Sequence, residues 1–179
     1  MKNAIIFHGT DCKPEDFWYS WLEDRLEEKG YKVDLPHYSD INRTPIKEFI
    51  PKVLENHTFN SETLLIGHSA GVPLILSILE NIDQKISKAV LVAGFCQPLP
   101  FADTDVVLQK SYDWKKIKSN AEDFLILNSV NDPWGCDDKQ GRKLFDELGG
   151  TLIIRNDGHF GSSKDPDYTE LPIVEKLLS

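Results

Sequence analysis

The protein has 179 residues, 40% of them hydrophobic, and its 20 Lys and Arg against 29 Asp and Glu give a formal net charge of -9. Roughly 70% of the surface of an unfolded chain of this length can be buried in one core, so we expect a single domain over residues 1–179. The acidic balance, with no basic cluster to offset it, argues against nucleic acid and anionic membrane surfaces as partners.

Cysteine usage points to a reducing compartment. Cys12, Cys96 and Cys136 are an odd number and show neither CxxC nor Cys/His ligand spacing, which fits neither a disulfide framework nor a zinc site. The longest apolar stretch, residues 89–96, is far shorter than a membrane span, and the start MKNAIIFHG has too few apolar residues for a secretory leader. We therefore expect an unprocessed cytoplasmic protein.

Short apolar runs, several of them β-branched, alternate with helical patterns along the chain. Runs that are apolar on both faces are typical of strands covered by helices on both sides, and their alternation with helices predicts parallel strands with right-handed crossovers. The predicted fold class is therefore α/β, a three-layer α/β/α sandwich. The expected strands are 4–7, a weaker 31–35, 64–66, 88–93, 124–130 and 151–154.

The helical segments have recognisable starts and stops. Pro14 and Gly30 bound the first, Asp137 is a candidate cap for a later helix that ends at Gly149, and Pro51 predicts a kink or a short helix within 43–57. Residues 95–118 predict an extended loop, a possible lid, that leads into a short DWKKIK helix. Two further helices are expected directly after Ser69 and over 168–178.

The segment Gly67-His68-Ser69-Ala70-Gly71 lies between a predicted strand and a predicted helix. This is the GxSxG pattern of a nucleophile elbow in its expected context, where the serine hydroxyl is presented at a helix N-terminus. The helix dipole and the backbone N–H of Ala70 can there face a developing oxyanion. The alternative interpretation is an ordinary tight strand-to-helix turn.

A serine needs a general base, and the base needs an acid that orients it. His159 is the best candidate base because it follows the last strand between two glycines, although a solvated loop histidine is the plain alternative. Asp132, which follows the fifth strand, is the best acid, although it could be only a turn former before Pro133. The less favoured acids are Asp157, Asp103 and Asp105.

The three candidates share one edge of the predicted sheet, because all of them follow carboxyl ends of strands, in the order Ser, Asp, His. The loop after the first strand should lie beside the serine and supply a second oxyanion donor, the N–H of Thr10 or, next, that of Gly9. Gly9 would also permit close approach of an acyl group. His8 is expected to order this loop rather than to catalyse.

Aromatic residues near these motifs are candidate walls of a substrate pocket. Phe17, Trp18, Tyr19 and Trp21 crowd one predicted helix, where packing is the first interpretation and a pocket wall the second. Trp134 lies two residues after Asp132, in a loop that could overlook the site or only shield the carboxylate. The candidate substrate-binding residues are Gly9, Trp18, Trp134 and Phe160.

Several of these features together resemble the small serine hydrolases of the retinoblastoma-binding protein 9/YdeN family: GHSAG, HGT after the first strand, NDP, the late GH and WYSWL. The resemblance spans nearly the whole chain and implies a compact α/β-hydrolase fold of about six parallel strands without a large lid domain. It also implies Ser69 as nucleophile, Asp132 as acid, His159 as base, and Trp18 and Trp21 framing the site. The LxCxE motif tied to retinoblastoma-protein binding is absent, so that partner is not implied.

The sequence therefore predicts a serine hydrolase without metal or other cofactor, acting on small carboxylic esters, with thioesters and amides as further candidates. Its partner would be a small-molecule acyl substrate, and protein partners are unknown. The alternative is an inactive binding protein on the same fold, since a fold alone does not determine function.

Overall fold

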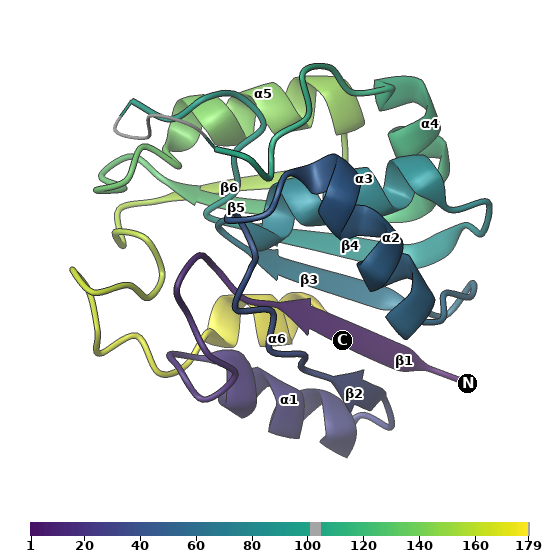
Figure 1. Ribbon diagram of the computed structural model, residues 1–179. Coiled ribbons are helices and arrows are strands. Elements are labelled where there is room, and N and C mark those ends of the chain that lie inside the picture. The colour runs from purple at the N-terminus through teal and green to yellow at the C-terminus, as the bar shows by residue number, and fades with distance from the viewer. Residues whose placement is uncertain (101–104, 179) are drawn as a thin grey trace.

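The computed structural model describes residues 1–100 and 105–178, which form one six-stranded sheet with helices on both faces (Figure 1). The strand order is β2-β1-β3-β4-β5-β6, and every neighbouring pair is parallel. This confirms the predicted three-layer class. The strands are β1 (Asn3–Phe7), β2 (Lys32–Asp34), β3 (Leu64–His68), β4 (Ile86–Val92), β5 (Ala121–Ser129) and β6 (Thr151–Arg155).

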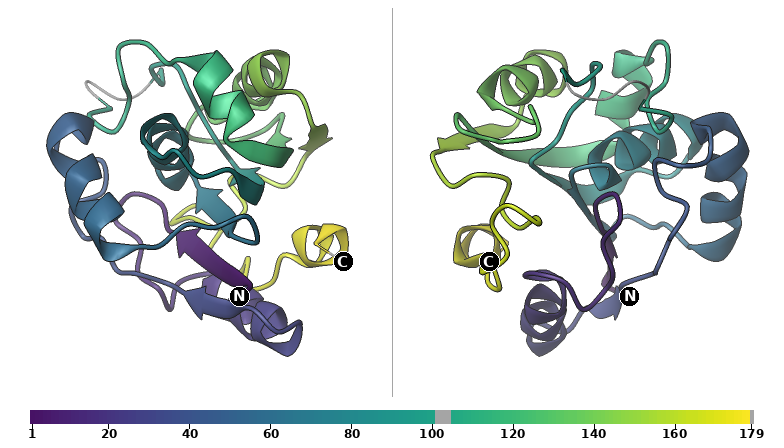
Figure 2. Two further views of the ribbon diagram at one scale, coloured as in Figure 1. Left: turned by 90° about the vertical axis from the view of Figure 1, so that its right-hand side faces the viewer. Right: turned by 60° about the vertical axis from the view of Figure 1, so that its left-hand side comes forward.

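The helices divide between the two faces of the sheet (Figure 2). α1 (Tyr19–Glu28) and α6 (Pro172–Leu177) contact each other on one face. The other face carries a row of contacting helices, α2 (Ile46–Asn56), α3 (Gly71–Asn81), α4 (Trp114–Ser119) and α5 (Asp138–Leu148). α3 is buried from Gly71 to Leu79 because it lies under α2 and α4, which explains its uniformly apolar sequence.

Side-chain caps place two helices where the sequence predicts them. The Asp137 carboxylate accepts hydrogen bonds from the backbone N–H groups of Lys139 and Gln140 at 3.0 and 3.3 Å, and α5 ends before Gly149 at φ 77°. Asp113 accepts in the same way from the N–H of Lys116 at 3.0 Å and begins α4. Pro51 is accommodated inside α2, which runs 11 residues.

Two helices begin later than predicted. α1 begins at Tyr19 rather than Pro14, because the Asp16 carboxylate accepts from the Lys13 N–H at 2.7 Å and Phe17 adopts a left-handed φ of 52°, which helical backbone does not allow. α6 begins at Pro172 rather than at residue 168, because a proline disfavours helical backbone in the residue before it.

The parallel strands end at a common edge, where the loops after β1, β3, β5 and β6 gather (Figure 1). These four loops contain the residues around Gly9, Ser69, Asp132 and His159. No helix among those that the structure describes is long and apolar enough to cross a membrane.

Candidate active site

Ser69 lies on a sharp turn between β3 and α3. Its φ is 52°, a left-handed conformation that is uncommon for residues other than glycine, and its backbone N–H donates to the Val92 carbonyl at 2.9 Å. The flanking glycines are required by packing: a Cβ on Gly71 would lie 2.3 Å from the Phe7 carbonyl oxygen, and one on Gly67 would lie 2.7 Å from the Gly71 backbone. The turn therefore holds a strained serine tightly against β1.

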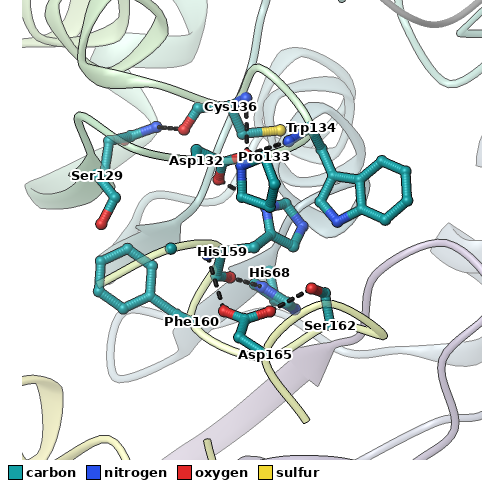
Figure 3. A network of polar contacts seen from close by, with 12 residues as sticks. His68, Ser129, Asp132, Pro133, Trp134, Cys136, His159, Phe160, Ser162 and Asp165 are labelled. Carbon is teal, nitrogen blue, oxygen red and sulfur yellow. Dashed lines mark hydrogen bonds and ion pairs between the residues drawn. The ribbon is translucent and has the colours of Figure 1, made fainter. Parts of the chain in front are cut away.

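The carboxylate of Asp132 and the imidazole of His159 form a buried pair (Figure 3). His159 Nδ1 donates to Asp132 Oδ2 at 2.7 Å, and the Asp132 side chain is 0% exposed. Asp132 Oδ1 accepts from the backbone N–H groups of Trp134 and Cys136 at 2.8 and 3.3 Å, so the carboxylate is fixed from both sides. Since a carboxylate only accepts, the proton lies on Nδ1, and Nε2 of the neutral ring is left as an acceptor.

Ser69 and His159 line the same cavity, of about 550 Å³. Gly9, Thr10 and Trp134 line it too. The structure thus brings the predicted serine, histidine and aspartate to one edge of the sheet, although they lie on three separate loops.

The other candidate acids have other partners. Asp157 Oδ2 accepts from Arg155 Nε at 2.7 Å, while Asp105 lines the cavity but accepts from Asn42 Nδ2 and the Leu99 N–H, each at 3.3 Å. Asp103 lies outside the described residues.

The two backbone N–H groups predicted to form an oxyanion hole are available to donate to a substrate oxygen. Within the part of the chain that the structure describes, the N–H groups of Thr10 and Ala70 have no hydrogen-bond acceptor. The N–H of Gly9 is already engaged, since it donates to the Tyr19 hydroxyl at 3.3 Å. A Cβ on Gly9 would lie 3.2 Å from Ser69 Cβ, so this loop does lie against the serine.

A buried hydrogen-bond chain connects the Gly9 loop to the His159 loop. His68 Nε2 donates to the His159 carbonyl at 2.8 Å (Figure 3), so His68 Nδ1 must accept from the Tyr19 hydroxyl at 2.5 Å. Burial holds the pKa of His68 well below its usual value, which keeps the ring neutral and suits both bonds. His68 and Tyr19 therefore fix the backbone of His159 in place.

The same loop is clamped from its other side by Asp165. This carboxylate accepts from the backbone N–H groups of His159 and Gly161 at 2.9 and 3.2 Å, and it also bonds the Ser162 hydroxyl (Figure 3). No spacing in the sequence signals this clamp, because it depends on how the chain turns at Phe160 and Gly161, at φ 55° and 110°.

Two predicted substrate-binding residues lie behind the cavity wall. Trp18 and Phe160 are 0% exposed and are absent from the cavity lining, and Trp18 Nε1 donates to the Phe160 carbonyl at 2.7 Å. The prediction that they contact substrate is therefore wrong. Because α1 begins only at Tyr19, Trp18 is the N-cap residue of this helix, and its ring packs against His68. Phe17, at the strained turn before α1, lines the cavity in that place.

Cys136 lies beside the site, which the sequence did not indicate. Cys136 Sγ, a carboxylate oxygen of Asp132 and a ring nitrogen of His159 all lie within 4.8 Å of one another. The spacing of these three residues in the sequence does not match a metal-ligand motif. Burial raises the pKa of this thiol well above its usual value, and the Asp132 charge raises it further. The thiol thus stays protonated, which disfavours metal binding.

Tyr19→Phe is expected to lower the free energy of unfolding by about 2 kcal/mol, because the N–H of Gly9 and Nδ1 of His68 both lose their partner while buried. Urea denaturation measures this loss. Tyr31→Phe is the matched control, because no side-chain hydrogen bond of Tyr31 exists among the described residues, and it should change stability by less than about 0.5 kcal/mol. Equal stability of the two variants would show that the buried chain contributes nothing.

Comparison with known proteins agrees with this geometry. The serine hydrolase family profile matches residues 4–179. A Bacillus subtilis hydrolase named YdeN is 28% identical over 99% of this chain and 95% of its own length, and the serine hydrolase RBBP9 of Rattus norvegicus is 23% identical over 90% and 86%. The crystal structure of the B. subtilis ydeN gene product superposes with a TM-score of 0.88 at 27% identity and covers 99% of this chain and 97% of that one. The chain therefore belongs to the serine hydrolase family, within the α/β hydrolase superfamily.

Proposed function

We propose that the protein hydrolyses small carboxylic esters through an acyl-enzyme on Ser69. His159 is the general base, Asp132 orients and stabilises it, and the N–H groups of Ala70 and Thr10 form the oxyanion hole. The turn at Ser69 is then a nucleophile elbow. The single observation on which this rests most heavily is the 2.7 Å bond between Asp132 and His159, in a ring whose Nε2 remains an acceptor beside the cavity that Ser69 lines.

The chemistry follows from these positions. Nε2 of His159 takes the Ser69 proton as Oγ bonds to the ester carbonyl carbon, and the N–H groups of Thr10 and Ala70 donate to the negatively charged oxygen. The C–O bond to the alcohol then breaks, and His159 returns the proton to the departing oxygen. Water, deprotonated by His159, attacks the acyl-enzyme and releases the carboxylic acid and free Ser69.

Thioesters and amides are substrates of the same chemistry, because only the leaving atom differs. We propose esters first because an ester alcohol is a better leaving group than an amine, so the ester bond breaks with less assistance from His159. We further propose a cytoplasmic location, supported by the three cysteines, all of which are free.

The test is steady-state release of p-nitrophenol from acetyl, butyryl and octanoyl esters, together with intact mass of enzyme quenched during turnover. The expected result is saturable turnover and a covalent species heavier by one acyl group. A protein that only binds ligands on this fold would release no p-nitrophenol above the rate of heat-denatured protein, and its mass would not change.

A further inference from the structure

The cavity beside Ser69 and His159 has an unusual balance of charge. Three carboxylates line it, those of Asp11, Asp16 and Asp105. Among residues 1–100 and 105–178, no Lys or Arg side chain lines it. An anionic substrate would therefore find no lysine or arginine side chain in this part of the wall.

Two of the three carboxylates have no cationic partner among the residues that the structure describes. Asp11 forms an exposed ion pair with Arg43, which offsets its negative charge. Asp16 accepts from the backbone N–H of Lys13 at 2.7 Å, and Asp105 accepts from an amide and a backbone N–H. These donors are neutral, so the described contacts leave two full negative charges at the cavity.

These charges reach the interior of the site. Burial raises the pKa of the Cys12 thiol, which lines the cavity, and the negative charge of Asp16 raises it further. Burial raises the pKa of Tyr19 and Cys136 in the same way, and Asp16 and Asp105 respectively add to these shifts. The carboxylates of Asp16 and Asp105 thus act on side chains that surround the reacting groups.

Aromatic rings complete a surface suited to a cation. Phe17 and Trp134 line the cavity together with the carboxylates, next to Phe95, which is 1% exposed, and ring faces attract ammonium groups through their quadrupole. One face of the Trp134 ring is already covered by Lys164, whose Nζ lies 4.0 Å from the ring centroid, so Phe17 is the main aromatic contact offered to a ligand. Lys164 is not itself part of the cavity lining, and its Nζ also donates to the Pro133 carbonyl at 3.4 Å.

We infer that this cavity selects esters that carry a cationic group, such as a quaternary or primary ammonium, and rejects those that carry a carboxylate or phosphate. The inference rests on the proposed function and specifies its substrate class. Asp16 and Asp105 are the specificity-determining residues, and Phe17 provides an aromatic contact.

The catalytic test compares three acetate esters at constant ionic strength: the choline ester, the 3,3-dimethylbutyl ester, and 4-acetoxybutanoate. The first two have nearly the same shape and differ in charge, so kcat/KM for the choline ester should be about tenfold higher. The anionic ester should be the poorest of the three. A choline ester hydrolysed no better than its neutral counterpart would overturn the inference while leaving esterase activity established.

The variants assign this preference to the two carboxylates. In Asp16→Asn with Asp105→Asn, the ratio of kcat/KM for the cationic and neutral esters should fall severalfold, because most of the Coulomb attraction is removed while the aromatic contact remains. Asp83→Asn is the matched control, since it removes one charge from an exposed residue outside the cavity and should keep the ratio. A ratio that survives in the double variant would contradict the assignment.

A binding measurement separates this inference from the proposed function. Tetraethylammonium chloride should shift the indole N–H resonance of Trp134, identified by its loss in Trp134→Phe, and 3,3-dimethylbutanol should shift it less. In the double variant this difference should shrink severalfold. Selective binding without ester turnover would uphold the cation site and refute the esterase; turnover without selective binding would do the reverse.

Discussion

Ser69→Ala is expected to reduce turnover of p-nitrophenyl acetate by about 10⁴-fold or more, because the variant lacks the atom that bonds to the acyl carbon. Only the uncatalysed reaction and any assistance from the oxyanion donors would remain. The loss should appear in kcat, since the cavity walls that bind the ester are unchanged. Stopped-flow and steady-state measurement of p-nitrophenol release both report it.

The variant should remain folded. Residue 69 keeps a left-handed φ of 52° in either form, and its backbone bond to Val92 does not use the hydroxyl. Ser119→Ala is the matched control, because the Ser119 hydroxyl caps α4 through the Lys116 carbonyl, away from the cavity. Turnover by Ser69→Ala within tenfold of wild type would remove this serine from the mechanism.

Asp132→Asn is expected to reduce kcat by about 10³- to 10⁴-fold. An asparagine can keep its oxygen on the N–H groups of Trp134 and Cys136, which then points its NH₂ group at His159. Nδ1 must become an acceptor, so the proton moves to Nε2, the nitrogen that should receive the serine proton. The fold survives while the base has the wrong tautomer, which ¹⁵N resonances of His159 would report directly.

Asp157→Asn is the matched control for this change, since Asp157 also lies beside His159 in sequence. Its carboxylate bonds Arg155, and both groups are partly exposed, so the substitution should alter kcat by less than about twofold. If Asp157→Asn were the damaging change and Asp132→Asn harmless, the assignment of the acid would be wrong.

The fold was predictable because its core strands are apolar on both faces. Residues Leu64 to His68 and Phe124 to Ser129 are buried throughout, as parallel strands between helices require. The weak run at 31–35 corresponds to β2 (Lys32–Asp34), a short edge strand. Its residues are exposed or half-buried, so the strand needs few apolar residues and gives only a weak pattern in the sequence.

The position of the site was predictable, but its inner contacts were not. Parallel strands place their carboxyl ends at one edge, which is why Ser69, Asp132 and His159 could be named together. The clamp of Asp165 on the His159 backbone and the burial of Trp18 depend on left-handed turns at Phe17 and Phe160. Periodicity says nothing about such turns in residues other than glycine.

Labelling with a fluorophosphonate probe, followed by peptide mass spectrometry, tests most directly whether Ser69 is an activated nucleophile. We expect one phosphonyl group per chain, mapped to the peptide that contains Ser69, with labelling slowed strongly in Asp132→Asn and absent in Ser69→Ala. A chain whose intact mass stays unchanged after long exposure, or whose adduct lies on another residue, would contradict it.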